Sequence, residues 1–411
     1  MTSYLFTGGR FLDPDRTELL DGIDVLVEDD RVKEVSERPI RSASATRIDL
    51  EGKTLMPGLV DSHVHVIAAM VDLAANAAQP SSLATLRASR VMNAMLMRGF
   101  TTVRDLGGAD AGLVAGVEEG LIDGPRLVIC GKALGQTGGH TDVRGRFDDR
   151  PDFGGRVGSL GRLVDGVDAI RRASREEIKA GAQFIKIMAN GGVASPNDPI
   201  HALGFSRDEI RAAVEEAENA GFYVSAHLYT DQAIRRAVEC GVHSLEHCNL
   251  IQSPTAELAV KAGAVAIPTL AAYEGLALEG AALGLKLESV AKIETVRKAG
   301  LESLDIMRRA GLPMAYGSDL LGGLHKYQSM EFEIRSRVLP AHEILFAATQ
   351  MGARLCRMEG EIGVLAPGSY ADLLVVAGDP YRDLSVLQDQ GSHMAAIMRG
   401  GRFFKNVLRS M

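Results

Sequence analysis

The stretch Leu55-Met-Pro-Gly-Leu-Val-Asp-Ser-His-Val-His-Val66 decides how the rest of the chain is interpreted. Its β-branched residues predict a buried strand, and Pro57-Gly58 predicts the turn that begins it. His63 and His65 lie two residues apart, so on a strand both side chains point to the same face, roughly 6–7 Å apart along it. Two neutral imidazoles in this arrangement can share one divalent metal ion. Two histidines on a solvent-facing edge give the same pattern, so a metal site requires further ligands elsewhere in the chain.

The composition is that of an ordinary globular protein, with 411 residues, 46% of them apolar and 24% charged. The formal net charge of −8 argues against partners such as nucleic acid or an anionic membrane surface. No apolar run approaches the roughly 20 residues that span a bilayer, and the first residues lack the pattern of a signal peptide. The four cysteines form no CxxC pair, which is typical of a reducing compartment. We therefore expect a cytoplasmic protein.

The two ends of the chain predict a different architecture from its middle. Both ends contain short alternating strands separated by glycine turns, so we interpret residues 1–56 and 358–411 as one small β-sandwich domain. In the middle, helical segments alternate with eight strand segments: the stretch quoted above and residues 101–105, 127–130, 184–188, 223–227, 244–248, 264–268 and 313–317. This alternation predicts the α/β class, with a (β/α)₈ TIM barrel over residues 57–357.

Three segments between these strands and helices are predicted to be loops at the carboxyl ends of the strands. They comprise residues 134–158, 190–205 and 273–283. Active sites of such barrels lie on this face, and its loops carry specificity. We therefore expect the substrate to be selected there.

Six side chains with metal-binding chemistry fall at or near the ends of predicted strands. They are His63, His65, Lys186, His227, His247 and Asp319. Consecutive strands of a closed barrel would carry such residues around one rim. Their shared placement turns the weak His-x-His pattern into a predicted metal centre.

Lys186 has two interpretations. A lysine flanked by Ile185 and Ile187 in a buried strand is costly if it is charged, so it could reach the rim or pair with Asp319. Alternatively, the amine reacts with carbon dioxide, and the resulting carbamate bridges two metal ions. In that case each ion has three or four protein ligands.

The motifs around these residues resemble the amidohydrolase superfamily over essentially the whole chain. They include Val60-Asp-Ser-His-Val-His65, Ala226-His-Leu-Tyr-Thr230, Leu245-Glu-His247, Gly317-Ser-Asp319 and the flank Gly363-Val-Leu-Ala-Pro-Gly-Ser-Tyr-Ala-Asp-Leu373. The chain is most similar to the binuclear, lysine-bridged branch, which includes Xaa-Pro dipeptidase-like, imidazolonepropionase-related and ochratoxin-type amidohydrolases. Mononuclear deaminases of the superfamily lack the strand-four lysine.

This resemblance implies a role for each candidate ligand. His63, His65 and Asp319 would hold one divalent ion and His227 and His247 a second, both expected to be zinc, with carbamylated Lys186 between them. Asp319 would also take the proton of the bridging water and deliver it to the leaving amine. The second ion would polarise the scissile carbonyl.

Four further side chains near the predicted site receive weaker assignments. His140, after the third strand, could donate to the carbonyl oxygen as a catalytic and substrate-binding group, or be an ordinary loop histidine. Tyr229 could bind a substrate carboxylate or simply pack, and His325 could contact substrate or face solvent. Glu246 is expected to point to the opposite face of its strand from His247, so it is not counted as a ligand.

These observations predict metal-dependent hydrolysis of an amide bond by a metal-bridging hydroxide. The expected substrate is a carboxylate-bearing dipeptide or N-acyl amino acid, of the Xaa-Pro or ochratoxin type. Cyclic amide hydrolysis, deamination at a single metal and a non-catalytic scaffold stay open as alternatives. Because barrels of this size often associate, we also expect a homo-oligomer.

Overall fold

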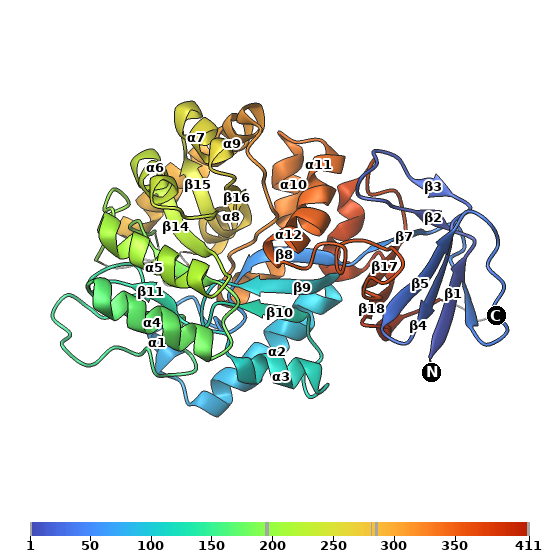
Figure 1. Cartoon of the computed structure of the whole chain (residues 1–411), viewed down its shortest axis with the longest axis horizontal. Coiled ribbons are helices and arrows are strands. Elements are labelled where there is room, and N and C mark those ends of the chain that lie inside the picture. Colours follow the sequence, from blue (N-terminus) through green and yellow to red (C-terminus); the bar gives the residue numbers. More distant parts are fainter. Residues whose placement is uncertain (1, 194–196, 281, 284–286, 409–411) are drawn as a thin grey trace.

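The structure is a computed structural model, and it describes residues 2–193, 197–280, 282–283 and 287–408. Figure 1 shows a larger part, in which strands are surrounded by helices, and a smaller part of strands that holds both ends of the chain. Helices and strands are thus mixed, as the α/β prediction requires.

The smaller part contains two sheets. One has the order β5-β4-β1-β6, from β1 (Ser3–Thr7), β4 (Asp24–Glu28), β5 (Arg31–Ser36) and β6 (Thr46–Asp49). The other has the order β19-β18-β17-β7-β2-β3, from β2 (Arg10–Phe11), β3 (Leu20–Asp21), β7 (Thr54–Pro57), β17 (Leu373–Val376), β18 (Met394–Arg399) and β19 (Arg402–Asn406). Leu55 of β7 pairs with Val375 of β17, so the two ends of the chain meet in one sheet. Phe6 and Val25 of the first sheet share a hydrophobic cluster with Val375.

The larger part contains parallel strands. A three-stranded sheet has the order β10-β9-β8, from β8 (Leu59–Val64), β9 (Phe100–Asp105) and β10 (Arg126–Ile129). A six-stranded sheet has the order β12-β11-β13-β14-β15-β16, from β11 (Ala133–Gly135), β12 (Gly161–Leu163), β13 (Ile185–Met188), β14 (Val224–Thr230), β15 (Ser244–Leu250) and β16 (Val265–Ile267).

This arrangement differs from the single closed ring that the sequence predicted. The described strands of the larger part fall into two sheets. The predicted eighth strand, 313–317, contributes only an isolated bridge between Met314 and Ala266 among the described residues. Backbone hydrogen bonds nevertheless connect the three-stranded sheet to the segments on both sides of it. Gln183 donates to Ile129 at 2.8 Å, and Ser62 donates to the carbonyl of Tyr316 at 2.8 Å. The strands β11 and β12 were not predicted. Each has only three residues, one of them glycine, which is too short for an alternation of apolar and polar residues to be recognised.

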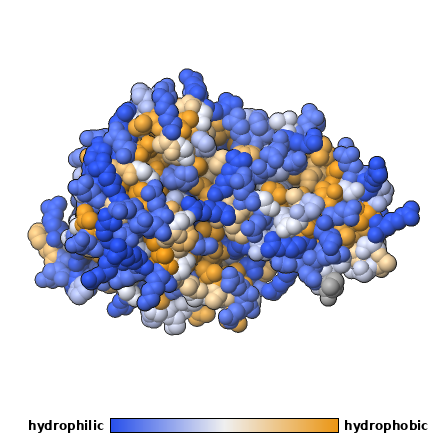
Figure 2. Space-filling view, viewed as in Figure 1, coloured by the Kyte–Doolittle hydropathy of each residue, from blue (hydrophilic) through white to orange (hydrophobic). Residues whose placement is uncertain are grey.

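Helices surround these sheets. They are α1 (Leu73–Ala78), α2 (Ser81–Met97), α3 (Ala111–Glu118), α4 (Val167–Lys179), α5 (Arg207–Asn219), α6 (Asp231–Glu239), α7 (Ser253–Lys261), α8 (Leu270–Glu279), α9 (Leu287–Ala310), α10 (Met330–Ser336), α11 (Ala341–Phe346) and α12 (Gly352–Leu355). The face of the molecule shown in Figure 2 is mainly polar, because hydrophilic side chains predominate on it. In the described part of the chain, no helix combines the length and apolar character needed to cross a bilayer.

The three predicted loops have different outcomes. Residues 134–135 belong to β11, so the predicted loop began two residues too early, whereas residues 136–158 are irregular as predicted. Residues 190–205 contain no helix or strand where they are described. Residues 273–279 are helical, because α8 continues to Glu279, so the loop predicted there was wrong. Residues 194–196, 281 and 284–286 lie outside the described residues.

The smaller part leads directly into the strand that carries the paired histidines. Strand β7 ends at Pro57 and β8 begins at Leu59, with only Gly58 between them. A Cβ atom on Gly58 would lie 2.1 Å from Oγ1 of Thr101, so glycine permits the close approach of β9. This junction fixes the start of β8 and thereby the position of His63.

Candidate metal centre and active site

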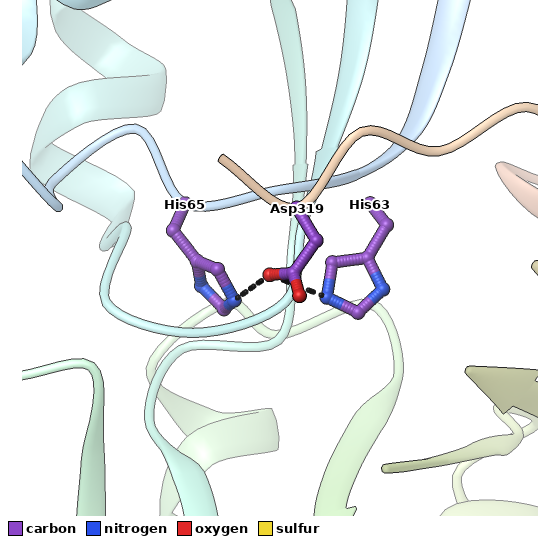
Figure 3. Close-up of side chains that lie close together, drawn as sticks. All are labelled: His63, His65 and Asp319. Carbon is purple, nitrogen blue, oxygen red and sulfur yellow. Dashed lines mark ion pairs between the residues drawn. The ribbon is translucent and has the colours of Figure 1, made fainter. Parts of the chain in front are cut away.

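His63, His65 and Asp319 lie together at the end of β8 (Figure 3). Their ligand atoms all lie within 4.8 Å of one another. Oδ1 of Asp319 is 3.3 Å from Nε2 of His63 and 3.3 Å from Nε2 of His65. Burial opposes ionisation of Asp319, but the neighbouring histidines, His63 foremost, hold its pKa well below the usual value. The group offers two imidazole nitrogens and a carboxylate oxygen, a donor set that suits zinc.

The second set of predicted ligands lies on three neighbouring strands of the six-stranded sheet, with Lys186 on β13, His227 on β14 and His247 on β15. The rings of His227 and His247 lie 4.5 Å apart, and the His247 ring lies 5.0 Å from that of His63. Lys186 is 1% exposed on β13, which pairs with β14. The structure thus brings His227 and His247 beside the first group and buries Lys186 on the neighbouring strand.

The polar atoms of this second set lack hydrogen-bond partners. Within the described part of the chain, Nζ of Lys186, Nε2 of His227 and Nε2 of His247 are buried and unpaired. Burial lowers the pKa of Lys186 to about 8 and holds the pKa of both histidines well below the usual value. Buried polar atoms are nearly always paired in folded proteins. Three unpaired nitrogen atoms on neighbouring strands therefore indicate that this site binds a ligand such as a metal ion. This donor set fits divalent metal ions.

Glu246 corrects the sequence interpretation. Its Oε2 accepts a hydrogen bond from Nδ1 of His63 at 2.7 Å, so its side chain points toward the site and not away from it. The predicted alternation fails because His247 has a φ of 74°, a left-handed conformation that turns its ring to the same side as Glu246. Non-glycine residues rarely adopt this conformation, and they do so mainly at functional sites.

A fully buried polar network holds Glu246 in place. Its Oε1 accepts from Nη2 of Arg104 at 2.6 Å and from the hydroxyls of Ser225 and Ser244, each at 2.6 Å. Burial opposes ionisation of Glu246, but Arg104 and His63 hold its pKa well below the usual value. The carboxylate therefore accepts the Nδ1 proton of His63 and fixes the ring so that Nε2 faces Asp319. An arginine inside predicted strand 101–105 was the available sequence signal for this network.

Two other histidine rings are also held through Nδ1. Nδ1 of His65 lies 3.2 Å from the carbonyl oxygen of Gly107, and Nδ1 of His247 lies 2.8 Å from Oγ1 of Thr269. In each case Nε2 remains available toward the site. Such outer partners fix the ring orientation of metal-binding histidines. Sequence analysis did not single out Thr269, because this residue lies just beyond the predicted seventh strand, 264–268.

Asp61 of β8 connects this strand to the loop that carries Asp319 through side-chain hydrogen bonds. It accepts hydrogen bonds from the backbone N–H of His63, the N–H and hydroxyl of Ser318, and the side chain of Gln328. Burial raises the pKa of Asp61. Asp319 itself has a φ of 51° and donates its N–H to the carbonyl of His63 at 2.8 Å. The uncommon backbone conformation of Asp319 is thus stabilised by its own hydrogen bond to His63 and by the hydrogen bonds of the neighbouring Ser318 to Asp61.

A partly enclosed cavity opens onto these groups. His65, His227, Asp319, His140 and Tyr229 line it, together with mainly aliphatic side chains that include Leu73, Val143, Leu160, Met188, Val193, Leu276, Leu321 and Leu324. Among the described lining residues there is no lysine or arginine. The cavity therefore suits a substrate with an apolar portion.

The three weaker candidates are placed differently. The ring of His140 stacks on His227 with centroids 4.2 Å apart, and Tyr229 stacks on His247 at 5.1 Å. His325 does not line the cavity. It is buried, and its Nε2 donates to the carbonyl of Ala68 at 3.0 Å, so the structure does not bring it to the site. Tyr273, which sequence analysis did not single out, lines the cavity beside Tyr229.

Comparison with known proteins identifies the family. Residues 54–402 match the model of the amidohydrolase family. The chain belongs to the amidohydrolase family. It is accordingly a hydrolase acting on amide bonds, and members of this family generally bind metal.

Individual relatives span nearly the whole chain. Ochratoxinase from Aspergillus niger is 30% identical over 387 residues, which cover 90% of this chain and 79% of that protein. A crystal structure of an amidohydrolase is 51% identical, with a TM-score of 0.97, over 99% of this chain and 100% of that chain. A crystal structure of a prolidase complexed with N-methylphosphonate-L-proline is 48% identical, with a TM-score of 0.97, over 98% of this chain and 100% of that chain.

Proposed function

We propose that this amidohydrolase uses a binuclear metal centre to cleave the amide bond of a carboxylate-bearing N-acyl amino acid or Xaa-Pro dipeptide. The observation that carries this proposal is the convergence of His63, His65 and Asp319 with the unpaired atoms of Lys186, His227 and His247. Six donors of these types exceed what one tetrahedral ion requires. Three of them, His65, His227 and Asp319, also border the cavity that would hold the substrate.

The ligand set divides between two ions. His63, His65 and Asp319 would hold one, His227 and His247 would hold the other, and carbamylated Lys186 would bridge them. Carbamylation would convert an unpaired buried amine into a carboxylate with two ligand oxygens. When bound, the ions would supply a nucleophilic water at neutral pH and Lewis-acid polarisation of the scissile carbonyl. Zinc suits these nitrogen and oxygen donors.

The side chains that line the cavity then have separate tasks. Asp319 would accept the proton of the attacking water and donate it to the leaving nitrogen, since its carboxylate lies between the ligands and the cavity. His140 would donate to the carbonyl oxygen as negative charge develops on it. The Tyr229 hydroxyl would donate to the substrate carboxylate. We assign no substrate contact to His325.

The relatives narrow the substrate class. The prolidase that is 48% identical binds a proline derivative, which supports proline or a similar amino acid on the leaving side of the bond. The similarity to ochratoxinase supports a substrate of the ochratoxin type. The aliphatic cavity would take an apolar acyl group or side chain.

We also propose that the parallel strands and helices form a (β/α)₈ TIM barrel over residues 57–357. The hydrogen bonds from Ser62 to Tyr316 and from Gln183 to Ile129 support this arrangement, because they connect the three-stranded sheet to the segments on both sides of it. Residues 1–56 and 358–411 would form a β-sandwich, supported by the hydrophobic cluster that their two sheets share.

A substrate panel tests the proposed function. Zinc-loaded protein would be assayed with N-acyl-prolines, Xaa-Pro dipeptides, N-acyl-phenylalanines and a cyclic amide, and again after chelation. We expect hydrolysis of the linear amides and its loss on chelation. Turnover of the cyclic amide alone would contradict the linear-amide assignment. Deamination with one metal per chain would contradict the binuclear centre, and no turnover of any kind would indicate a scaffold.

A further inference from the structure

We infer that Thr269 and Tyr273 form a hydrogen-bonded chain that couples the metal ligand His247 to the substrate-binding hydroxyl of Tyr229. The inference rests on the proposed function for the roles of its two ends. Thr269 and Tyr273 themselves are positioning residues, because they act through His247 and Tyr229.

The chain runs through four buried side chains. Nδ1 of His247 lies 2.8 Å from Oγ1 of Thr269, and this hydroxyl lies 3.4 Å from that of Tyr273. The Tyr273 hydroxyl donates to the Tyr229 hydroxyl at 3.1 Å. The ring of Tyr229 also stacks on that of His247 at 5.1 Å, so the two ends of the chain lie beside each other.

Proton counting gives the chain a direction. Tyr273 uses its one proton on Tyr229, so toward Thr269 it accepts. Thr269 then uses its proton on Tyr273, so toward His247 it accepts, and Nδ1 of His247 carries hydrogen. The lone pair of His247 is therefore on Nε2, the buried atom that has no partner in the described part of the chain. The chain selects the tautomer that a metal ion requires.

The same count fixes the other end. Tyr229 accepts from Tyr273, so its own proton is not used by the chain, and Tyr229 lines the cavity. It is thereby committed to donate to an oxygen acceptor of the substrate. The described lining residues of the cavity include no lysine or arginine, which leaves such neutral donors to recognise a carboxylate. We assign the substrate carboxylate as this acceptor.

Four variants test the coupling. Tyr273→Phe keeps the ring and removes the donor, Thr269→Val removes the hydroxyl, and Thr269→Ser retains it. Tyr381→Phe is the matched control, because it also removes one tyrosine hydrogen bond, to the carbonyl of Asp13 in the smaller part. For each variant, calorimetry on metal-stripped protein gives the affinity for Zn²⁺, and zinc-loaded protein gives kcat and KM on an N-acyl-proline.

The coupling predicts joint losses at both ends. Tyr273→Phe and Thr269→Val should each weaken Zn²⁺ binding about tenfold, the scale of outer-partner loss at metal sites. Tyr273→Phe should also raise KM about tenfold with little change in kcat. Thr269→Ser, which keeps the hydroxyl, should recover most of the zinc affinity that Thr269→Val loses. The inference is overturned if Tyr273→Phe matches Tyr381→Phe in either zinc affinity or KM.

Binding of proline and prolinamide to zinc-loaded protein identifies the acceptor. Tyr273→Phe should weaken proline binding and leave prolinamide binding unchanged. Equal losses for the two ligands would assign Tyr229 to a carbonyl oxygen and overturn the carboxylate assignment. If wild-type protein hydrolyses no linear amide, the proposed function fails, while the zinc affinities of Tyr273→Phe and Thr269→Val still test the chain.

Discussion

The two halves of the candidate metal centre differ in how their polar atoms are satisfied. In the first half, His63, His65 and Asp319 contact one another, with 3.3 Å between carboxylate and imidazoles. In the second half, Lys186, His227 and His247 each keep a buried nitrogen without a partner in the described structure. A buried unpaired polar group costs about 1–3 kcal/mol. The first half is thus held by its own contacts, whereas the second half has the more to gain from metal and carbamate.

Removing the carboxylate of the first half should have the largest effect on turnover. We expect Asp319→Asn to lower kcat about 1,000-fold, because proton transfer to the leaving nitrogen is lost, while zinc binding is largely retained. Steady-state kinetics on an N-acyl-proline, with zinc analysis of the same sample, would check this. Asp305→Asn is the control, since Asp305 pairs with exposed Arg309 on the surface of α9. Full activity of Asp319→Asn would overturn the assigned role.

Truncating Lys186, the proposed bridging residue, tests the second half. Lys186→Ala should lower kcat at least about 100-fold, since Lewis-acid stabilisation is worth several kcal/mol. Because the variant retains a space where the carbamate would lie, added acetate or propionate should restore part of the activity. Rescue is measured as kcat against carboxylate concentration. An unmodified lysine that serves only in packing predicts no dependence on added carboxylate.

Breaking the support of His63 should have a smaller effect on activity. In Glu246→Gln the carboxylate that accepts from His63 and pairs with Arg104 is neutralised. We expect zinc affinity to fall about 10–100-fold and the free energy of unfolding to drop by about 3 kcal/mol, because the Arg104 charge stays buried without its partner. Calorimetric zinc titration and urea unfolding measure the two effects. Glu216→Gln is the matched control, because the buried Glu216 of α5 also pairs with arginines, Arg171 and Arg175 of α4. Equal behaviour of the two variants would argue against a positioning role.

The sequence was informative where local periodicity decides the outcome. The strands that carry His63, Lys186, His227 and His247 were predicted from runs of apolar residues, and the structure has strands there. The pairing of both chain ends in one sheet followed from the similar patterns at the two ends. A local sequence pattern also marks the start of α5, where Ser206 and Glu209 form a capping box.

The sequence failed where a single backbone angle or a distant contact decides. The left-handed φ of His247 reverses the facing of Glu246, and no alternation rule anticipates it. Thr269 and Tyr273 matter through contacts with strands β14 and β15, which are distant in sequence. The position of His325 depends on a hydrogen bond to Ala68, 257 residues away. Such tertiary contacts override local patterns.

The most direct test of the account is the metal content of wild-type protein, together with the mass of the peptide or intact chain that contains Lys186. Protein purified with zinc and bicarbonate would be analysed for zinc per chain by elemental mass spectrometry, and for carbamate under native conditions. The account predicts about two zinc ions per chain and a carbamylated Lys186. About one ion per chain with an unmodified lysine would contradict it.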